Sequence, residues 1–292
     1  MTKLENLVLS HPKYSRLGTD VPFAERQRIL DEITEEILSR LTPEDILSHS
    51  LEIYNETAEH YLAAPEHQNI IDELVLFMNL NELPSGSSII DLGCGFGRDA
   101  LFMSCPNPDF RKEQMKRVSN GKTTLERYPV PNKYFYVLGV DNCRKMIGSA
   151  DDKKKRIRGN FYSSPLFAVY DIHRLDELSL FPVDGIWSCA SLFTHTPMVL
   201  VPKILKFIKG ILRSGGIFAV SYTQGFQECS YNKLLLSRTG RIKYFSQPMA
   251  SAIENEARKF GLKLIYQSQD NFDREGKLVA RNLFATQFFQ KE

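Results

Sequence analysis

Apolar residues recur along this 292-residue chain at two kinds of spacing, and the kind changes near residue 88. Before that point, three- and four-residue spacings dominate, as is typical of helices that bury one face. Thr42 followed by Pro43 is typical of a helix start. The pattern therefore predicts a helical N-terminal part, with helices over residues 22–41, from Thr42 onward, and over 50–64 and 66–80.

From residue 88 onward, short apolar runs alternate with helical patterns. Alternation of this kind predicts an α/β fold whose parallel strands are covered by helices on both faces. Strands are expected over residues 88–92, 134–140, 166–170, 185–189, 217–222, 262–267 and 282–289. Helices are expected over residues 98–103, 142–150, 199–212 and 249–260. A short connection that contains the polar segment 270–277 joins the last two strands, so we expect these strands to pair antiparallel.

Residues 104–132 interrupt this alternation. They are rich in Pro, Asn, Lys and Arg and show little periodicity. We interpret them as an insertion that is partly loop. A loop of that length in a compact domain usually has a function of its own.

Composition narrows the classes of function. The formal net charge is only +2, which does not favour a nucleic-acid-binding surface. The five cysteines form no CxxC pair, which argues against a disulfide framework or a zinc site, so no bound metal is expected. Neither a secretory signal nor an apolar run of membrane-spanning length is apparent. We therefore expect a cytoplasmic protein without nucleic-acid or membrane partners.

A glycine-rich turn follows the first predicted strand and precedes a helix. Residues 91–97 read DLGCGFG. Glycines at alternate positions let a flat ligand approach the backbone, and the N-terminus of the following helix points its N–H groups at that ligand. The GxGxG spacing differs from the GxGxxG of dinucleotide-binding proteins, which disfavours an NAD-dependent oxidoreductase. Asp91 would repel a pyrophosphate but can receive an ammonium group. The alternative is a satisfied residue at a strand end.

Two further carboxylates end the next two predicted strands. Asp141 could accept hydrogen bonds from both hydroxyls of a ribose, and Asp171 could accept one from the amino group of an adenine. The carboxyl ends of parallel strands meet at one edge of a sheet, where open α/β sheets bind their ligands. Together with Asp91, these residues indicate a site for a nucleoside that carries an amino acid.

Five segments, in this order, resemble the class I S-adenosylmethionine-dependent methyltransferases of the small-molecule and natural-product type: 89–103, 136–147, 167–175, 183–197 and 212–222. The resemblance implies a Rossmann-like sheet of seven mostly parallel strands with an antiparallel last strand, and S-adenosylmethionine as the cofactor. It covers residues 54–292 and leaves residues 1–53 as a helical extension, which in similar proteins often covers the acceptor site. The insertion places Asp141 further along the chain than is usual, so its assignment requires the insertion to loop out.

The same resemblance implies roles for individual residues. Asp91 and the glycines after it hold the methionine end of the cofactor, and Asp141 holds the ribose. Asp171 and Ile172 flank the adenine, and Ser191 faces the sulfonium. The expected cofactor contacts are Tyr61, Asp91, Gly93, Cys94, Gly95, Arg98, Asp141, Asn142, Asp171, Ile172, Ala190 and Ser191.

His195 follows the fourth predicted strand and is the candidate catalytic base, because a histidine there would lie near the methyl-transfer point. A packing or helix-capping role is the alternative. The helix with Tyr54 and Tyr61 resembles the one that closes over the cofactor in the family, although an amphipathic core helix would also explain it. Arg98 could pair with the carboxylate of the cofactor, with an acidic acceptor, or in a surface salt bridge.

Acceptor contacts are expected from Tyr54, His195, Tyr222, Arg241 and Tyr244, because similar enzymes place such contacts in these regions. We predict methylation of a small molecule or peptide-like metabolite, at the oxygen of a carboxylate or hydroxyl. The alternatives are methylation of nitrogen in an amine or a protein, and a non-catalytic module that binds S-adenosylmethionine. Residues 189–192, CASL, lack the Asn/Asp-Pro-Pro-aromatic tetrad of DNA amino-methyltransferases.

Overall fold

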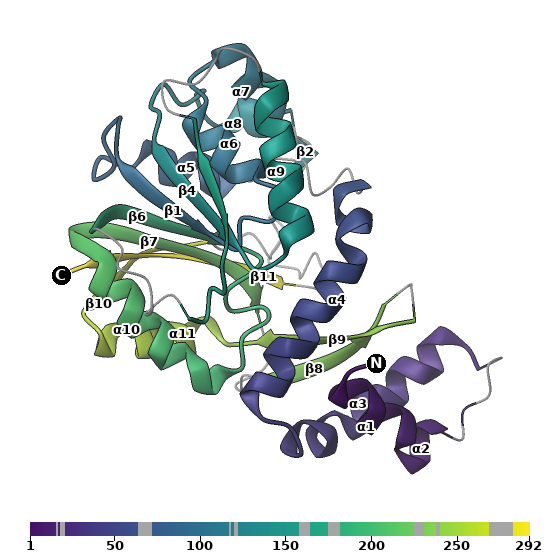
Figure 1. Cartoon of the computed structure of the whole chain (residues 1–292). Coiled ribbons are helices and arrows are strands. Elements are labelled where there is room, and N and C mark those ends of the chain that lie inside the picture. Colours follow the sequence, from purple (N-terminus) through teal and green to yellow (C-terminus); the bar gives the residue numbers. More distant parts are fainter. Residues whose placement is uncertain are drawn as a thin grey trace.

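The computed structural model describes residues 1–15, 17, 21–63, 72–116, 118–119, 122–157, 164–174, 182–224, 231–237, 240–268 and 283–292. Predictions for residues 64–71 and 270–277 lie outside this described part. Figure 1 shows a central sheet with helices stacked against it and a helical N-terminal part beside one end. Among the described residues, no helix is both long and apolar enough to cross a membrane.

Within the described residues, a seven-stranded sheet forms the centre of the fold, in the order β10-β11-β7-β6-β1-β4-β5. Its strands are β1 (Ser88–Leu92), β4 (Tyr136–Asp141), β5 (Leu166–Val169), β6 (Val183–Cys189), β7 (Leu212–Gln224), β10 (Leu262–Gln267) and β11 (Leu283–Lys291). The pairs β1–β4, β1–β6, β4–β5 and β6–β7 are parallel, whereas β11 runs antiparallel to both β7 and β10. The predicted mostly parallel sheet with an antiparallel last strand is therefore confirmed.

Helices close an apolar core on each face of this sheet. Successive residues of a strand point to opposite faces, so Ile89 and Ile90 of β1 lie in different cores. The core of Ile90 is covered by α10 (Val201–Ile211), which follows the short η3 (Met198–Leu200), and by α11 (Ala250–Lys259). The core of Ile89 is covered by α5 (Asp72–Asn79) and α6 (Arg98–Ser104). A further helix packs on β4 and β5, namely α9 (Arg144–Arg156).

The N-terminal part consists of helices that pack beside the sheet (Figure 1). They are α1 (Lys3–Ser10), α2 (Pro12–Ser15), α3 (Phe23–Ser39) and α4 (Pro43–Ala63). The helices predicted over 22–41 and 50–64 correspond to α3 and α4, and α4 is one continuous helix from Pro43. α1 was not predicted, although Thr2 and Glu5 form a capping box, the local signal that begins this helix.

A hairpin of β8 (Tyr231–Leu236) and β9 (Ile242–Gln247) was also not predicted. Its buried residues Leu234 and Tyr244 share one apolar core with Leu4 and Leu30 of the N-terminal helices. The hairpin and the helices therefore complete a core that neither segment could close alone, which local periodicity could not show. The domain boundary at residue 53 falls inside α4 and stays a prediction.

The insertion over residues 104–132 contains α7 (Pro108–Gln114), β2 (Val118–Ser119), β3 (Lys122–Thr123) and α8 (Thr124–Arg127). Arg111 of α7 is fully buried and donates to the carbonyl oxygens of Phe102 and Met103 at 3.2 Å and of Pro131 at 2.5 Å. These bonds place the insertion at the C-terminal end of α6, whereas the glycine turn lies at its N-terminal end. The insertion thus loops out, and β4 still pairs with β1.

Replacing Arg111 by Met is expected to lower the free energy of unfolding by about 3 kcal/mol, because buried carbonyls lose their donor. Urea unfolding measures this change. Lys112→Met, at an exposed position of the same helix, is the matched control and should change stability by less than about 0.5 kcal/mol. Equal effects of the two substitutions would contradict the anchoring role of Arg111.

Candidate active site

A cleft opens at the carboxyl ends of β1, β4 and β6, and with the solvent space at its mouth it encloses about 1100 Å³. α4 forms the opposite wall, and Figure 1 shows this helix crossing that end of the sheet. The cleft brings together all of the expected cofactor contacts except Asp171, and two of the expected acceptor contacts. They are Tyr61, Asp91, Gly93, Cys94, Gly95, Arg98, Asp141, Asn142, Ile172, Ala190 and Ser191, with Tyr54 and His195.

The glycine turn depends on backbone conformations that side chains disfavour. Gly93 and Gly95 have φ angles of +72° and +52°. A Cβ atom at Gly93 would lie 1.8 Å from Ser191 Oγ, so only glycine lets the segment after β6 approach the turn this closely. The N–H groups of Gly93 and Cys94 donate to the carbonyl oxygen of Val140 at 2.8 and 3.1 Å. The turn is thereby fastened to the end of β4.

Asp91 presents a buried carboxylate to the cleft. It is only 2% exposed, and among the described residues its Oδ2 atom has no hydrogen-bond partner. Burial and the neighbouring Asp99 carboxylate raise the pKa of Asp91 well above its usual range, against the opposing effect of Arg98. A buried acceptor without a donor destabilises a fold by about 1–3 kcal/mol. A ligand with a cationic N–H group would supply the donor.

Asp141 is oriented by backbone donors on both sides. Its Oδ2 atom accepts from the Gly95 N–H at 2.9 Å, and its Oδ1 atom accepts from the Cys143 N–H at 2.8 Å. Burial raises the pKa of Asp141, and these two hydrogen bonds oppose the rise. Each carboxylate oxygen can accept a second hydrogen bond. A pair of ligand hydroxyls can therefore bind beside the glycine turn.

Arg98 is held at the cleft wall by its neighbour. Its Nε and Nη2 atoms donate to the two oxygens of Asp99 at 2.5 and 2.9 Å. Trp187 Nε1 also donates to Asp99 Oδ2, at 2.8 Å. Asp99 was not predicted as a site residue. It partly offsets the charge of Arg98 and sets the position of its guanidinium.

Asp171 does not line the cleft, in contrast to the role that the resemblance implied. Its Oδ1 atom accepts from the backbone N–H of His173 at 2.9 Å and lies 3.1 Å from the ring Nδ1 of the same residue. The hydrogen bond from the His173 side chain lowers the pKa of Asp171. A short polar side chain often turns back to its own backbone in this way. Ile172 and His173 line the cleft instead.

Tyr54 of α4 and His195 meet at the cleft. The Tyr54 hydroxyl oxygen lies 2.5 Å from His195 Nε2, and His195 Nδ1 lies 3.3 Å from the carbonyl oxygen of Tyr244. Burial lowers the pKa of His195 to about 4, so the imidazole is neutral at pH 7. A neutral imidazole has a single N–H group. That group donates to the Tyr244 carbonyl, and Nε2 accepts from the Tyr54 hydroxyl.

Tyr61 and Lys243 continue this polar chain. The Tyr61 hydroxyl lies 3.5 Å from that of Tyr54, and Lys243 Nζ donates to the Tyr61 hydroxyl at 2.9 Å. The two tyrosine rings stack with their centroids 5.4 Å apart. Lys243 belongs to β9, a strand that was not predicted, and it was therefore missed as a neighbour of the site.

Two predicted acceptor contacts, Tyr222 and Tyr244, direct their side chains away from the cleft. The hydroxyl of Tyr222 is buried in the core and donates to Gln287 Oε1 at 2.6 Å. The ring of Tyr244 lies in the N-terminal core, and its hydroxyl donates to Asn232 Oδ1 at 2.7 Å. Strand residues alternate between faces, so the side chain of Tyr244 lies opposite to that of Lys243. Only the carbonyl of Tyr244 reaches the site.

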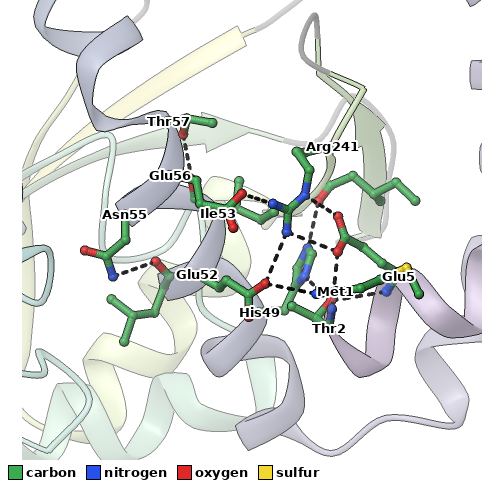
Figure 2. A network of polar contacts seen from close by, with 12 residues as sticks. Met1, Thr2, Glu5, His49, Glu52, Ile53, Asn55, Glu56, Thr57 and Arg241 are labelled. Atoms are coloured by element: carbon green, nitrogen blue, oxygen red, sulfur yellow. Dashed lines mark hydrogen bonds and ion pairs between the residues drawn. The ribbon is translucent and has the colours of Figure 1, made fainter.

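Arg241, the third such contact, is engaged elsewhere. Figure 2 shows its guanidinium among the carboxylates of Glu5, Glu52 and Glu56. Its Nε atom lies 2.6 Å from Glu5 Oε1, and its Nη2 atom lies 3.3 Å from Glu52 Oε1. The residue therefore ties α1 and α4 to the start of β9 instead of meeting an acceptor. The partner Glu5 lies 236 positions away, beyond the reach of local sequence patterns.

One face of α4 contributes residues that were not predicted. Leu47, Ser50 and Leu51 line the cleft together with Tyr54 and Tyr61. These positions follow the three- and four-residue spacing of a single helix face, a signal that could have identified them. The other unpredicted lining residues lie within four positions of a predicted one in the chain: Phe96, Asp99, Met146, His173 and Cys189.

The sequence matches no family model, and no curated protein matches it. Solved structures do share its fold. Magnesium protoporphyrin IX methyltransferase (ChlM) from Synechocystis PCC 6803, with bound S-adenosylmethionine, superposes with a TM-score of 0.54 at 13% identity, over 86% of this chain and 98% of that one. The 1,6-didemethyltoxoflavin-N1-methyltransferase of Burkholderia thailandensis has a TM-score of 0.55 at 13% identity, over 86% and 91%.

The CcbJ methyltransferase of Streptomyces caelestis is similar as well, with a TM-score of 0.51 at 14% identity, over 80% of this chain and 96% of that one. At these identities the likeness concerns the fold. The chain has the fold of the S-adenosylmethionine-dependent methyltransferases, as the resemblance of its motifs implied. What its own site binds has to be argued from the residues in the cleft.

Asp91→Asn is expected to stabilise the unliganded protein at neutral pH. The folded-state pKa of Asp91 lies above the unfolded value of about 3.9. The contribution of Asp91 to stability is therefore fullest below that pH and is lost as pH rises through the folded pKa, by up to about 1.4 kcal/mol per pH unit. Asparagine does not ionise and escapes this loss.

Urea unfolding of both proteins between about pH 4 and pH 8 measures the difference, and the advantage of asparagine should grow with pH. Asp152→Asn, at an exposed position of α9, is the matched control and should show little change. A lower stability of Asp91→Asn across this range would show that the carboxylate is satisfied in the folded protein.

Proposed function

We propose that this protein binds S-adenosylmethionine and transfers its methyl group to the oxygen of a hydroxyl or carboxylate on a small-molecule or peptide-like acceptor. The observation that carries this proposal is Asp91 Oδ2, which lies beside the glycine turn and has no hydrogen-bond partner among the described residues. A carboxylate in that position attracts an ammonium group and repels a phosphate. It therefore favours an amino-acid-bearing nucleoside over a dinucleotide.

The remaining lining residues fit the other parts of this cofactor. Gly93 and Gly95 leave room for the methionine part against the backbone. Asp141 offers acceptor positions to both ribose hydroxyls, and Ile172 gives the adenine an apolar contact. When bound, the cofactor supplies a methyl group on positively charged sulfur, which makes that methyl electrophilic.

The residues of this chain contribute position, exclusion of water and a proton acceptor. Alignment of two reacting groups can remove about 7–11 kcal/mol from a barrier. α4 closes the cleft with the stacked rings of Tyr54 and Tyr61. A hydroxyl acceptor beside Tyr54 can pass its proton to the Tyr54 hydroxyl oxygen while Tyr54 passes its own proton to Nε2 of His195, which is unprotonated at pH 7 because the pKa of His195 is about 4. A carboxylate acceptor is already ionised and needs no base.

The positive charge of Lys243 favours methylation of an oxygen over methylation of a protonated amine. Lys243 Nζ lies 4.8 Å from the ring centroid of Tyr61 and 5.8 Å from that of Tyr54. A substrate ammonium beside these rings would be repelled by the lysine charge. A neutral hydroxyl or an anionic carboxylate meets no such penalty.

S-adenosylmethionine and its demethylated product should both bind the purified protein in titration calorimetry, and NAD should not. Gly93→Ala should weaken binding of both adenosyl compounds by at least about 100-fold, because a side chain at this φ is strained and overlaps Ser191. Gly148→Ala, where an added Cβ atom would meet nothing within 4 Å, is the matched control. If neither adenosyl compound binds the unmodified protein, the proposed function is wrong.

His195→Ala should reduce methyl transfer by about 10²–10⁴-fold while leaving the affinity for the demethylated cofactor unchanged. A radiolabelled methyl-transfer screen over carboxylate, phenol and amine pools first identifies an acceptor and then measures this loss. With a hydroxyl acceptor, activity should fall on the acid side near pH 4, where His195 becomes protonated, instead of near pH 6.5. Undiminished turnover in His195→Ala would exclude the base role.

A further inference from the structure

Lys243 places a positive charge beside two tyrosines of the cleft wall. Its side chain is half-buried, and its Nζ atom donates to the Tyr61 hydroxyl at 2.9 Å. Tyr61 and Tyr54, whose rings lie next to this ammonium, both line the cleft. Within the part of the chain that the structure describes, Lys243 forms no ion pair with a carboxylate.

Arg241, two residues before Lys243, has the carboxylate partners that Lys243 lacks within the described part of the chain. Alternation along an extended chain puts these two side chains on the same side. Arg241 is matched by Glu5, Glu52 and Glu56, so the N-terminal helices bring carboxylates to this cation. They bring none to Lys243 among the described residues. Acidic side chains are thus present along this side of β9, but none of the described ones reaches Lys243.

A half-buried ammonium that is left without a counter-ion is costly unless a ligand supplies one. An ammonium has three N–H groups, and the Tyr61 hydroxyl accepts from only one of them. The remaining donors suit an anionic oxygen. One ammonium balances the single charge of a carboxylate, whereas a phosphate dianion would keep an unbalanced charge.

Aromatic side chains surround this position. The ring of His195 lies 4.9 Å from the Tyr54 ring and 5.0 Å from the Phe245 ring, centroid to centroid. Tyr61 stacks on Tyr54, whereas His195 meets Tyr54 and Phe245 edge to face, so these rings form an aromatic cluster beside the cation. Such a cluster offers ring edges and faces to a planar ligand ring, and offset stacking and edge-to-face contacts stabilise aromatic pairs by about 0.5–1.5 kcal/mol.

We propose that the methyl acceptor carries a carboxylate on a planar apolar body, and that Lys243 binds this carboxylate. The inference rests on the proposed function, because it assigns the acceptor part of the same cleft. It also puts Lys243 in the place of Arg241, which was predicted as an acceptor contact.

The experiment titrates three small probes of one shape into the protein saturated with S-adenosylhomocysteine: benzoate, benzamide and phenyl phosphate. Benzoate should bind about tenfold more tightly than neutral benzamide, because a hydrogen bond to a charged group is worth more than a neutral one. It should also bind more tightly than phenyl phosphate. Equal affinity for benzoate and benzamide overturns the proposal without any variant, and tighter binding of phenyl phosphate overturns the choice of carboxylate.

Variants then assign the effect to Lys243. Lys243→Gln removes the charge but keeps a donor, and it should abolish the preference for benzoate over benzamide. Lys243→Arg should retain that preference. Lys206→Gln, at an exposed position of α10, makes the same charge change and is the matched control. A preference that survives in Lys243→Gln would overturn the assignment.

Affinity for S-adenosylhomocysteine is measured on every variant and separates the two proposals. If the unmodified protein does not bind S-adenosylhomocysteine, the proposed function itself is wrong. If Lys243→Gln loses S-adenosylhomocysteine and benzoate to the same extent, Lys243 binds the carboxylate of the cofactor, and the acceptor assignment is wrong. Retained cofactor affinity with lost benzoate preference is the result that we expect.

Discussion

The junction between the glycine turn and β4 determines the geometry of the whole candidate site. The Val140 carbonyl accepts from the N–H groups of Gly93 and Cys94, and Asp141 accepts from the N–H of Gly95. These bonds form because parallel pairing brings the ends of β1 and β4 side by side. The turn is thereby held between Asp141, whose two oxygens each accept one backbone N–H, and Asp91, whose Oδ2 atom has no partner among the described residues.

The opposite wall of the cleft is held by contacts outside it. Arg241 joins α1 and α4 through its glutamate partners (Figure 2). Beside it, His49 of α4 lies 2.7 Å from the Thr2 hydroxyl and 2.7 Å from the carbonyl oxygen of Ile242. α4 is therefore fastened at two points to the hairpin that carries Lys243. This polar network and the apolar core beneath it fix the positions of the residues that close the cleft.

The two walls of the cleft carry opposite charges, and the described residues supply neither a donor to Asp91 Oδ2 nor a carboxylate to Lys243. Asp91 offers an acceptor without a donor, and Lys243 offers donors without a carboxylate. A cationic group of the cofactor beside Asp91 and an anionic group of the acceptor beside Lys243 would supply these two partners. Strained electrostatics at a cleft are typical of functional sites, where stability is given up for binding.

The sequence by itself determined the sheet, the glycine turn and most of the residues that line the cleft from the sheet, because periodicity, glycine spacing and strand-end carboxylates are local signals. It could also have yielded Leu47 and Leu51, which share a helix face with Tyr54 and Tyr61. Only the tertiary structure decided the wall opposite the sheet. The hairpin of β8 and β9 is stabilised by helices far away in the chain, and that packing places Lys243 beside Tyr61 of the cleft wall. The same packing commits Arg241 to glutamates, because which charges meet depends on distances that no sequence spacing records.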